Sequence, residues 1–470
     1  MCIRDRIYGW GIMSNNDKND WVKELPKAFM AHKGTRKLEE VESIIPDIAG
    51  MSRGKTMPAH KFSSTGTTFL PISLFYQTIS GEYVDMDDIE NQWTEKDIVL
   101  RPDMTTATAV PWSEDASVQI INNIETREGD DLQIAPRNVL RRIMGLYEKK
   151  GWRAVVAPEL EFYLTKPNTD PKEEIQPPVG RTGRIGARQQ AFSMVAVDEF
   201  GDVIDTIYDY TEAQGLEIGT IIQEGGAGQI EINLMHGDPL SLADQVFYFK
   251  RTIREAALKH GVFATFMAKP MRDQPGSAMH IHQSIVDIKT NKNLFSKADG
   301  TPTDLFYNFI GGSQKHLQNS LPLLAPYVNS YRRLAGAYSA PSNLEWASDN
   351  RTTGLRIPIS GGDDRRVENR VTGSDANPYL AIAVSLAAGY LGMINKLNPR
   401  DSVNVEIFET DNGLPHSLFA ALNLFEEDKE LQQVLGQEFC DLYRQIKHAE
   451  LLEYQREISP WEREHLLLNA

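Results

Sequence analysis

The strongest constraint on this chain comes from charged residues at every second position of segments that are otherwise apolar. Glu159 and Glu161 alternate with apolar residues in AVVAPELEFYL, and His280 and His282 do so in GSAMHIH. Residues two apart in a β-strand place their side chains on one face. The pattern predicts a sheet whose strands belong to a core and yet present charged groups along one face.

Further charged residues follow the same rule. Arg366, Glu368 and Arg370 share one face of the run RVENRV, and Glu231 lies between two isoleucines in GQIEINL. Glu224 precedes a Gly-Gly-Ala-Gly segment. Because glycine has no Cβ, such a segment lets a ligand approach the backbone closely.

These residue types together indicate a particular chemistry. A buried carboxylate is costly unless it is paired or bound to a metal. Mg²⁺ and Mn²⁺ prefer oxygen ligands with an occasional imidazole, and they bridge substrate phosphates. Arginine suits planar carboxylate and phosphate groups. Carboxylates, a histidine and arginines on shared strand faces therefore indicate phosphoryl transfer to an acid.

Each motif alone has a simpler interpretation. A Glu-x-Glu pair is more often an exposed alternating face, and two histidines at i and i+2 are more often packing residues than ligands. Arg-x-Glu-x-Arg is compatible with a cross-strand ion-pair ladder, and the glycines with a plain turn. The functional interpretation depends on the co-occurrence of all of them.

Composition excludes several classes of function. With 470 residues the chain can bury the cores of two or three domains. A net charge of -16 argues against nucleic acid or an anionic membrane as partner. Cys2 and Cys440 provide neither a disulfide framework nor a thiolate metal site, which fits a cytoplasmic protein. The apolar run from Tyr379 to Ile394 is too short to span a membrane and predicts a buried core helix.

The chain divides into three parts. Residues 1–12 are expected to be an artefact of sequence assembly or disordered, residues 13–130 form an N-terminal domain, and residues 131–470 form a catalytic domain. Pro136 opens a helix that Gly151 stops. The second part alternates strands and helices, which predicts an α+β domain on a mostly antiparallel sheet.

Two local predictions follow in this second part. Ser241 is expected to cap a helix that ends at Gly261. Residues 263–269 are expected to form the next strand.

Eight ordered segments resemble the glutamine synthetase superfamily from about residue 35 to the C-terminus. They are ELEFYL (159–164), GQIEINL (228–234), ATFMAKP (264–270), GSAMHIH (276–282), NSYRRL (329–334), NRTTGLRIP (350–358), RVENRV (366–371) and DANPYL (375–380). Among the branches of this superfamily, the segments are most similar in sequence to glutamate–putrescine ligase and related γ-glutamylamine ligases. The resemblance implies an N-terminal β-grasp domain, a catalytic antiparallel half-barrel with flanking helices, and a homo-oligomer of two stacked hexameric rings.

The resemblance also implies roles for individual residues. It assigns one metal to Glu161, Glu224 and Glu231, and a second metal to Glu159, His280 and Glu368. It assigns glutamate binding to Arg333, Gly276 and Arg370, nucleotide phosphates to Arg351, Arg356 and Arg366, and the nucleoside to His282 and Ser284. Catalytic roles fall to Arg351, Arg370 and Glu368. The interval from Glu224 to Glu231 is one residue shorter than in typical glutamine synthetases, and the related amine ligases share the shorter interval.

The implied cofactors are ATP and two or three Mg²⁺ or Mn²⁺ ions per site. In the implied reaction, the γ-carboxylate of glutamate attacks the γ-phosphorus of ATP, and an amine then displaces phosphate from γ-glutamyl phosphate. No covalent enzyme intermediate is needed, so no serine or cysteine nucleophile is expected.

Two departures from the family pattern bear on the amine. Glutamine synthetases carry an ammonium-binding acid in a flap, where the run RLAGAYSAP has Ser339, and a second in the N-terminal domain, where TFLPIS has Leu70. An ammonium site needs negative charge and a base. The replacement of both acids by Ser339 and Leu70 predicts that the acceptor is an organic amine, such as putrescine, another polyamine or a small monoamine. This holds unless Glu345 or Asp349 takes the place of the missing acids. Two alternatives stay open, an ammonium-using glutamine synthetase and a catalytically silent structural or nitrogen-sensing relative.

Overall fold

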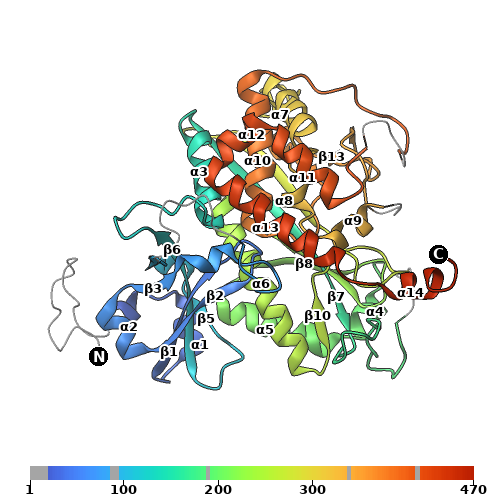
Figure 1. The fold of residues 1–470 in the computed structure, drawn as a ribbon. Helices are drawn as coiled ribbons and strands as arrows, with labels where there is room; N and C mark the ends of the chain where they lie inside the picture. The colour runs from blue at the N-terminus through green and yellow to red at the C-terminus, as the bar shows by residue number, and fades with distance from the viewer. Residues whose placement is uncertain (1–19, 85–94, 187–190, 336–339, 408–412) are drawn as a thin grey trace.

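The computed structural model describes residues 20–84, 95–186, 191–335, 340–407 and 413–470. The N-terminal part forms one lobe, and a larger lobe carries the remaining strands and most helices (Figure 1). Residues 1–12, expected to be an artefact or disordered, lie outside the described residues. The boundary near residue 130 stays a prediction, and it falls in the connection between strand β6 and helix α3.

The N-terminal lobe is built on a six-stranded mixed sheet with the order β2-β1-β6-β4-β3, and β5 pairs with β6. Strands β1 and β6 run parallel, and the other pairs are antiparallel. The elements are β1 (Leu38–Pro46), β2 (Ser52–Pro58), β3 (Thr68–Pro71), β4 (Asp97–Pro102), β5 (Thr108–Ala109) and β6 (Ala116–Glu125), with α1 (Lys27–Lys33), α2 (Ala59–Thr65), η1 (Asp20–Glu24), η2 (Ile72–Tyr76) and η3 (Met104–Thr106).

The second lobe is built on an eight-stranded sheet with the order β12-β13-β14-β11-β7-β9-β8, and β10 pairs with β7. All pairs are antiparallel except β12 with β13. The strands are β7 (Trp152–Thr165), β8 (Ile218–Gln223), β9 (Gln229–Leu234), β10 (Phe263–Thr265), β11 (Met279–Asp287), β12 (Trp346–Ser348), β13 (Leu355–Ile357) and β14 (Val367–Asn369). The mostly antiparallel α+β architecture predicted from the sequence is confirmed.

Helices cover this sheet and surround one central helix, α10 (Pro378–Asn395). The others are α3 (Pro136–Glu148), α4 (Met194–Asp198), α5 (Gly201–Gln214), α6 (Pro239–Lys259), α7 (Asp304–His316), α8 (Leu321–Leu324), α9 (Val328–Leu334), α11 (Leu418–Glu427), α12 (Lys429–Leu435), α13 (Gln437–Gln455) and α14 (Pro460–Leu466), with η4 (Gly362–Asp364). Within the described ranges, α10 alone is long and apolar enough to cross a membrane, and 89% of its apolar window is buried inside the protein. The predicted core helix is confirmed by its burial, but the argument from length was wrong, because the helix extends to Pro378–Asn395 and reaches 18 residues.

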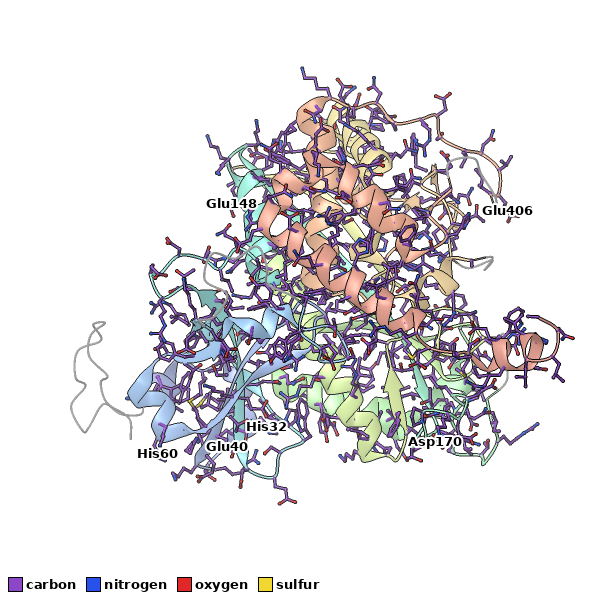
Figure 2. All side chains as sticks on the ribbon, in the orientation of Figure 1. His32, Glu40, His60, Glu148, Asp170 and Glu406 are labelled. Carbon is purple, nitrogen blue, oxygen red and sulfur yellow. The ribbon has the colours of Figure 1, made fainter. Side chains whose placement is uncertain are left out.

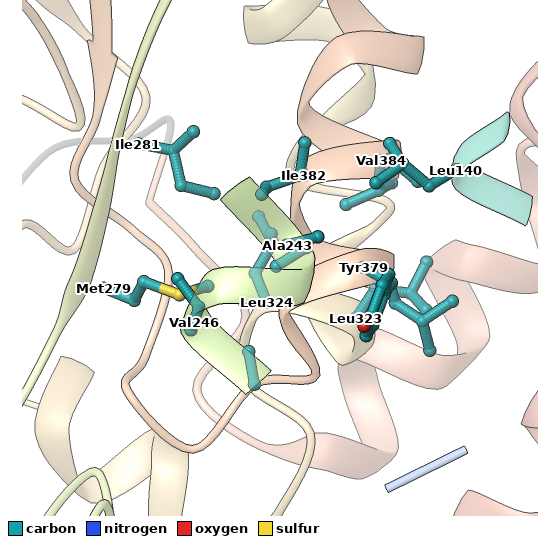
Figure 3. Close-up of a cluster of buried hydrophobic side chains, with 14 of the residues drawn as sticks. Leu140, Ala243, Val246, Met279, Ile281, Leu323, Leu324, Tyr379, Ile382 and Val384 are labelled. Carbon is teal, nitrogen blue, oxygen red and sulfur yellow. The ribbon is translucent and has the colours of Figure 1, made fainter. Parts of the chain in front are cut away.

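The main core lies between the sheet and α10. Figure 3 shows Met279 of β11 next to Val246 of α6, and Ile281 of β11 pointing toward Ile382 of α10, in a buried cluster that also includes Tyr379. Apolar residues of β11 thus point into the core, and the histidines that alternate with them point to the other face. The charged face of the sheet is held in place by this packing.

Arg137 of α3 joins the two lobes. Its guanidinium donates to Asp244 of α6 at 3.0 and 2.8 Å and to Asp103 of the N-terminal lobe at 2.8 Å. The hydroxyl of Tyr379 also donates to Asp244, at 2.6 Å. Arg137 is 2% exposed, so this network fixes how the two sheets meet.

Two local predictions were wrong in detail. Helix α6 is capped by the carboxylate of Asp238, which accepts from the amides of Leu240 and Ser241, and Pro239 occupies the first turn. Asp followed by Pro is a strong start signal and acts three residues earlier than the predicted cap, Ser241. The strand expected over residues 263–269 ends at Thr265, where pairing with β7 stops. The helix from Pro136, by contrast, is confirmed.

Candidate active site

The register of the second sheet brings the charged residues into one row. His280 of β11 pairs with Glu159 of β7, and His282 pairs with Glu368 of β14. Glu368 also pairs with Arg356 of β13, while Glu161 pairs with Glu231 of β9. Five neighbouring strands, β13, β14, β11, β7 and β9, therefore bring together residues from distant parts of the sequence.

One group of candidate metal ligands consists of Glu159, His280 and Glu368, whose ligand atoms lie within 4.8 Å of one another. Nδ1 of His280 is 3.2 Å from Glu159 and 3.9 Å from Glu368. Burial, together with the charge of Arg370, lowers the pKa of His280 to about 4. The imidazole is thus neutral near pH 7, which is the form that binds metals.

His282 has a defined tautomer. Nε of Arg366 donates to Nδ1 of His282 at 3.2 Å, and Nε2 of His282 lies 3.0 Å from Glu159. A guanidinium can only donate, so Nδ1 accepts and the ring proton sits on Nε2, facing the carboxylate. Although burial opposes ionisation of Glu159, the hydrogen bonds from His280 and His282 hold its pKa below the ordinary range.

A second group consists of Glu161, Glu231 and His280, again within 4.8 Å. Burial and the nearby Glu224 raise the pKa of Glu161 to about 8. Burial and the charges of Glu159, Glu161 and Glu224 raise the pKa of Glu231 to about 9. Glu224 follows β8, lies outside this tight group and has a pKa raised mainly by burial.

These carboxylates fit a divalent cation. Glu161 and Glu231 are 7% and 6% exposed and repel each other as anions. Nη1 of Arg370 donates a hydrogen bond to Oε1 of Glu368 at 2.6 Å. A cation bound to the oxygens would offset both the repulsion and the loss of hydration. The donor set of carboxylates with one imidazole suits Mg²⁺ or Mn²⁺.

The arginines lie along the row at different depths. Arg356 donates to Glu368 at 2.8 Å and to Asp349 at 2.8 Å. Nε of Arg370 is buried without a hydrogen-bond partner, although Nη1 is bonded. Arg351 is exposed in the turn before β13, and its charge acts on Glu224.

Arg333 of α9 is 2% exposed and lies behind this row. Its Nη1 donates to the carbonyl of Val371 at 2.7 Å, and its Nη2 donates to that of Arg370 at 2.9 Å. A Cβ added to Gly276 would lie 2.5 Å from Cγ of Arg333, so only glycine fits there. A guanidinium has five N–H donors, and these two bonds leave capacity for a carboxylate ligand.

The remaining predicted positions divide into three cases. Ser284 is half-buried on β11 and shares the face of His280 and His282. Ser339 lies outside the described residues. Leu70 of β3 packs partly against the main core, so its side chain serves the packing of that core.

Sequence reasoning overlooked Gln229 at this site, and it considered Asp349 only as a substitute acid and not as a partner of Arg356. Gln229 is 1% exposed and hydrogen-bonds Glu161, and Asp349 is bonded to Arg356. Period two would have found the first, because Gln229 lies two residues before Glu231 on the same strand. Other titratable groups lie apart from the row, and Figure 2 shows His32 and His60 on the N-terminal lobe.

Known proteins resemble this chain over most of its length. The family model described as "Glutamine synthetase, catalytic domain" matches residues 133–466. The chain is 34% identical to gamma-glutamylputrescine synthetase PuuA of Escherichia coli (strain K12), with 92% of each chain covered. It is 33% identical to glutamate–isopropylamine ligase of a Pseudomonas species, covering 88% of this chain and 92% of that protein. A glutamine synthetase of Halobacterium salinarum is 31% identical over 90% of this chain and 92% of that protein.

Solved structures show the same fold. The apo form of GmaS superposes with a TM-score of 0.79 at 25% identity, covering 94% of this chain and 99% of that one. A glutamine synthase homologue superposes with a TM-score of 0.76 at 23% identity, covering 89% and 95%. The resemblance and the fold class, an N-terminal β domain followed by the catalytic domain, are confirmed. The chain belongs to the glutamine synthetase family of ATP-dependent carbon–nitrogen ligases.

Proposed function

We propose that the chain joins the γ-carboxylate of glutamate to an organic amine through γ-glutamyl phosphate, using ATP and two or three Mg²⁺ or Mn²⁺ ions per site. The proposed acceptor is a polyamine such as putrescine or a small monoamine. The main support is that Ser339 and Leu70 stand where glutamine synthetases carry ammonium-binding acids, and each of the two acids considered as substitutes is paired with an arginine in the described part of the chain. Glu345 is 6% exposed and lies 3.3 Å from Arg400, and Asp349 is bonded to Arg356.

This pairing matters because an ammonium site needs uncommitted negative charge and a base. A carboxylate neutralised by an arginine attracts a second cation weakly. The sequence has Ser339 at the flap position, which carries no charge. A site without these acids lacks the charge that would hold ammonium, and this favours an organic amine as the acceptor.

The names of two relatives point the same way. The proteins at 34% and 33% identity are named for putrescine and isopropylamine, both organic amines. Glutamine synthetases match at 31% and 32%, so identity alone separates the two reactions weakly. The uncharged residues Ser339 and Leu70 therefore support the proposal more than the sequence identities do.

In the proposed site, Glu161, Glu224 and Glu231 would hold one metal, and Glu159, His280 and Glu368 a second. When bound, these ions would neutralise phosphate charge and orient the transferring group. Arg333 and Gly276 would hold glutamate, and Arg370 would contact its γ-carboxylate. Arg351, Arg356 and Arg366 would bind the nucleotide phosphates, with His282 and Ser284 near the nucleoside.

The chemistry of these residues follows from their charges. An oxygen of the γ-carboxylate attacks the γ-phosphorus, and ADP leaves. Arg370 and Arg351 are cations that offset the charge on the transferring group, and Glu368 keeps Arg370 in place at 2.6 Å. The amine nitrogen then attacks the activated carbonyl carbon, loses a proton and expels phosphate.

We further infer that the protein works in the cytoplasm as a homo-oligomer of two stacked hexameric rings. The support is the family membership and the low cysteine content. All six proposed metal ligands are present, which speaks against a catalytically silent relative.

Phosphate release tests the proposal directly. The protein is supplied with ATP, Mg²⁺ and glutamate, and with ammonium, methylamine, ethanolamine, isopropylamine, putrescine or spermidine in turn. Much faster release with one organic amine than with ammonium, together with the matching γ-glutamylamide by mass spectrometry, supports the ligase. Efficient release with ammonium alone would show that the chain is a glutamine synthetase. No release with any amine would favour the silent relative.

A further inference from the structure

Gln229 is buried at the point where three segments of the candidate active site meet. It begins β9, pairs with Tyr163 of β7 and is 1% exposed. Its backbone carbonyl accepts from the amide of Glu224 at 2.9 Å. The residue thus touches the strand of Glu161 and the loop of Glu224 at once.

The side-chain amide of Gln229 uses both of its ends. Nε2 donates to the carbonyl of Gly276 at 2.9 Å and to Oε2 of Glu161 at 3.3 Å. It also lies 3.4 Å from the hydroxyl of Ser277. Oε1 accepts from the amide of Gly226 at 2.9 Å and lies 3.1 Å from the hydroxyl of Tyr163, whose one proton it shares with the carbonyl of Pro275 at 2.8 Å. A primary amide donates only through its nitrogen and accepts only through its oxygen, and both ends of this one have partners.

These partners allow only one orientation of the amide. A flipped amide would set its oxygen against the Gly276 carbonyl and the Glu161 carboxylate, which are both acceptors. It would also set its NH₂ group against the Gly226 amide, which is a donor. The network therefore requires a group that donates toward Glu161 and accepts from the glycine loop.

The surroundings leave little room for these segments to adjust. A Cβ at Gly226 would lie 1.9 Å from the hydroxyl of Tyr163, and a Cβ at Gly228 would lie 2.9 Å from the carbonyl of Leu164. Gly228 also has φ +77°, a conformation that other residues rarely adopt. Close packing of this kind makes the position of Glu224 and Glu161 depend on the amide between them.

We propose that Gln229 is a positioning residue that sets the carboxylate of Glu161, the Glu224 loop and the Gly276 carbonyl relative to one another. It acts through these groups and does not itself touch the reacting atoms. This inference rests on the proposed role of Glu161 as a metal ligand and of Gly276 in glutamate binding. Hydrogen-bond partners of metal ligands commonly change metal affinity by about 10- to 100-fold when they are removed.

Two substitutions separate positioning from mere folding. Gln229→Glu keeps the size of the side chain and its acceptor contacts but cannot donate to Glu161 when ionised. Gln229→Leu removes all the hydrogen bonds of the side chain and leaves those of the backbone. The matched controls are Gln214→Glu and Gln214→Leu, because Gln214 of α5 is also buried (4% exposed). Its amide bonds Thr252 at 2.9 Å and Ala109 at 3.4 Å, and it belongs to no proposed ligand group.

The full-length proteins are titrated with Mn²⁺, with free Mn²⁺ measured by electron paramagnetic resonance, and KM for glutamate and for ATP is determined. We expect the Gln229 variants to bind Mn²⁺ about 10- to 100-fold more weakly. We also expect KM for glutamate to rise more than KM for ATP, because Gln229 has no contact with Glu159, His280 or Glu368. The Gln214 variants should match the wild type in both measurements, whatever they do to the melting temperature.

Wild-type Mn²⁺ affinity and an unchanged KM for glutamate in Gln229→Glu would overturn the inference and leave the proposed function standing. Absence of saturable Mn²⁺ binding by the wild-type protein would overturn the metal assignment and the inference together. If Gln229→Leu fails to fold, Gln229→Glu carries the test, since it preserves the volume and two of the contacts.

Discussion

Glu161 of β7 and Glu231 of β9 are direct partners across the catalytic sheet, and both carboxylates are buried. Two buried anions at one position of a sheet repel each other unless they are protonated or share a cation. The fold therefore maintains an arrangement that is unfavourable for the metal-free protein at high pH. This relationship gives the clearest prediction about stability.

We expect the metal-free protein to lose stability as the pH rises from about 5 to about 9. Burial raises the pKa of Glu161 to about 8 and that of Glu231 to about 9, against an ordinary value of 4.5. Between these values the folded protein holds protons that the unfolded chain has released, so deprotonation favours unfolding. The contribution is largest below the ordinary pKa and is lost as the pH passes through the folded values.

Urea unfolding in EDTA and in Mn²⁺, each at about pH 6 and about pH 8.5, measures this effect. The stabilisation by Mn²⁺ should be larger at the higher pH, because metal ligands must be deprotonated. Glu161→Gln should remove most of the difference. A stabilisation that is equal at both pH values would contradict the prediction.

Ser339→Glu should shift the amine preference toward ammonium. Under the proposed function, the substitution supplies the carboxylate that glutamine synthetases carry at this position, and this group can bind a small cation and accept its proton. A positioned base commonly contributes about 10²- to 10⁴-fold, so a rise of about tenfold or more in the ratio of kcat/KM for ammonium to that for the organic amine is expected. Ser339→Gln, of similar size without charge, is the control. An unchanged ratio in Ser339→Glu would contradict this view of the flap.

Asp349→Asn should affect nucleotide binding and leave the choice of amine unchanged. Asp349 bonds Arg356 at 2.8 Å, but Glu368 also bonds Arg356 at 2.8 Å, so the arginine keeps one partner. The Asp349 side chain is 47% exposed, and exposed ion pairs are worth about 0–1 kcal/mol. KM for ATP should therefore rise by about fivefold at most. Loss of activity with one amine but not another would instead make Asp349 part of the amine site.

Arg137→Met should destabilise the protein by about 3–5 kcal/mol, because it leaves the carboxylate of Asp244 buried without its cation. Asp244 would keep only the hydroxyl of Tyr379. The double substitution Arg137→Met with Asp244→Leu should recover part of the loss, since no buried charge remains. Urea unfolding of the single and double variants measures both effects. Equal stability of Arg137→Met and the wild type would show that the network contributes little to joining the lobes.

Much of the candidate active site could be predicted because periodicity is local. Glu159 and Glu161 are two residues apart, as are His280 and His282, so each pair lies on one face of any β-strand. In the structure these pairs lie on strands β7 and β11. The core helix α10 was predictable for a similar reason, since its apolar residues leave no polar face. The Ser241 prediction failed because Asp238 and Pro239 form a competing start signal nearby.

What the sequence by itself determined is which side chains share a face and which run forms the central helix, because both depend only on the geometry of one element. Only the tertiary structure decided that His282 faces Glu368 across β11 and β14, and that Gln229 joins Glu161 to Gly276. It also decided that the acids Glu345 and Asp349 are paired with arginines. Such partners come from distant parts of the chain, and packing of the whole core sets the register in which they meet.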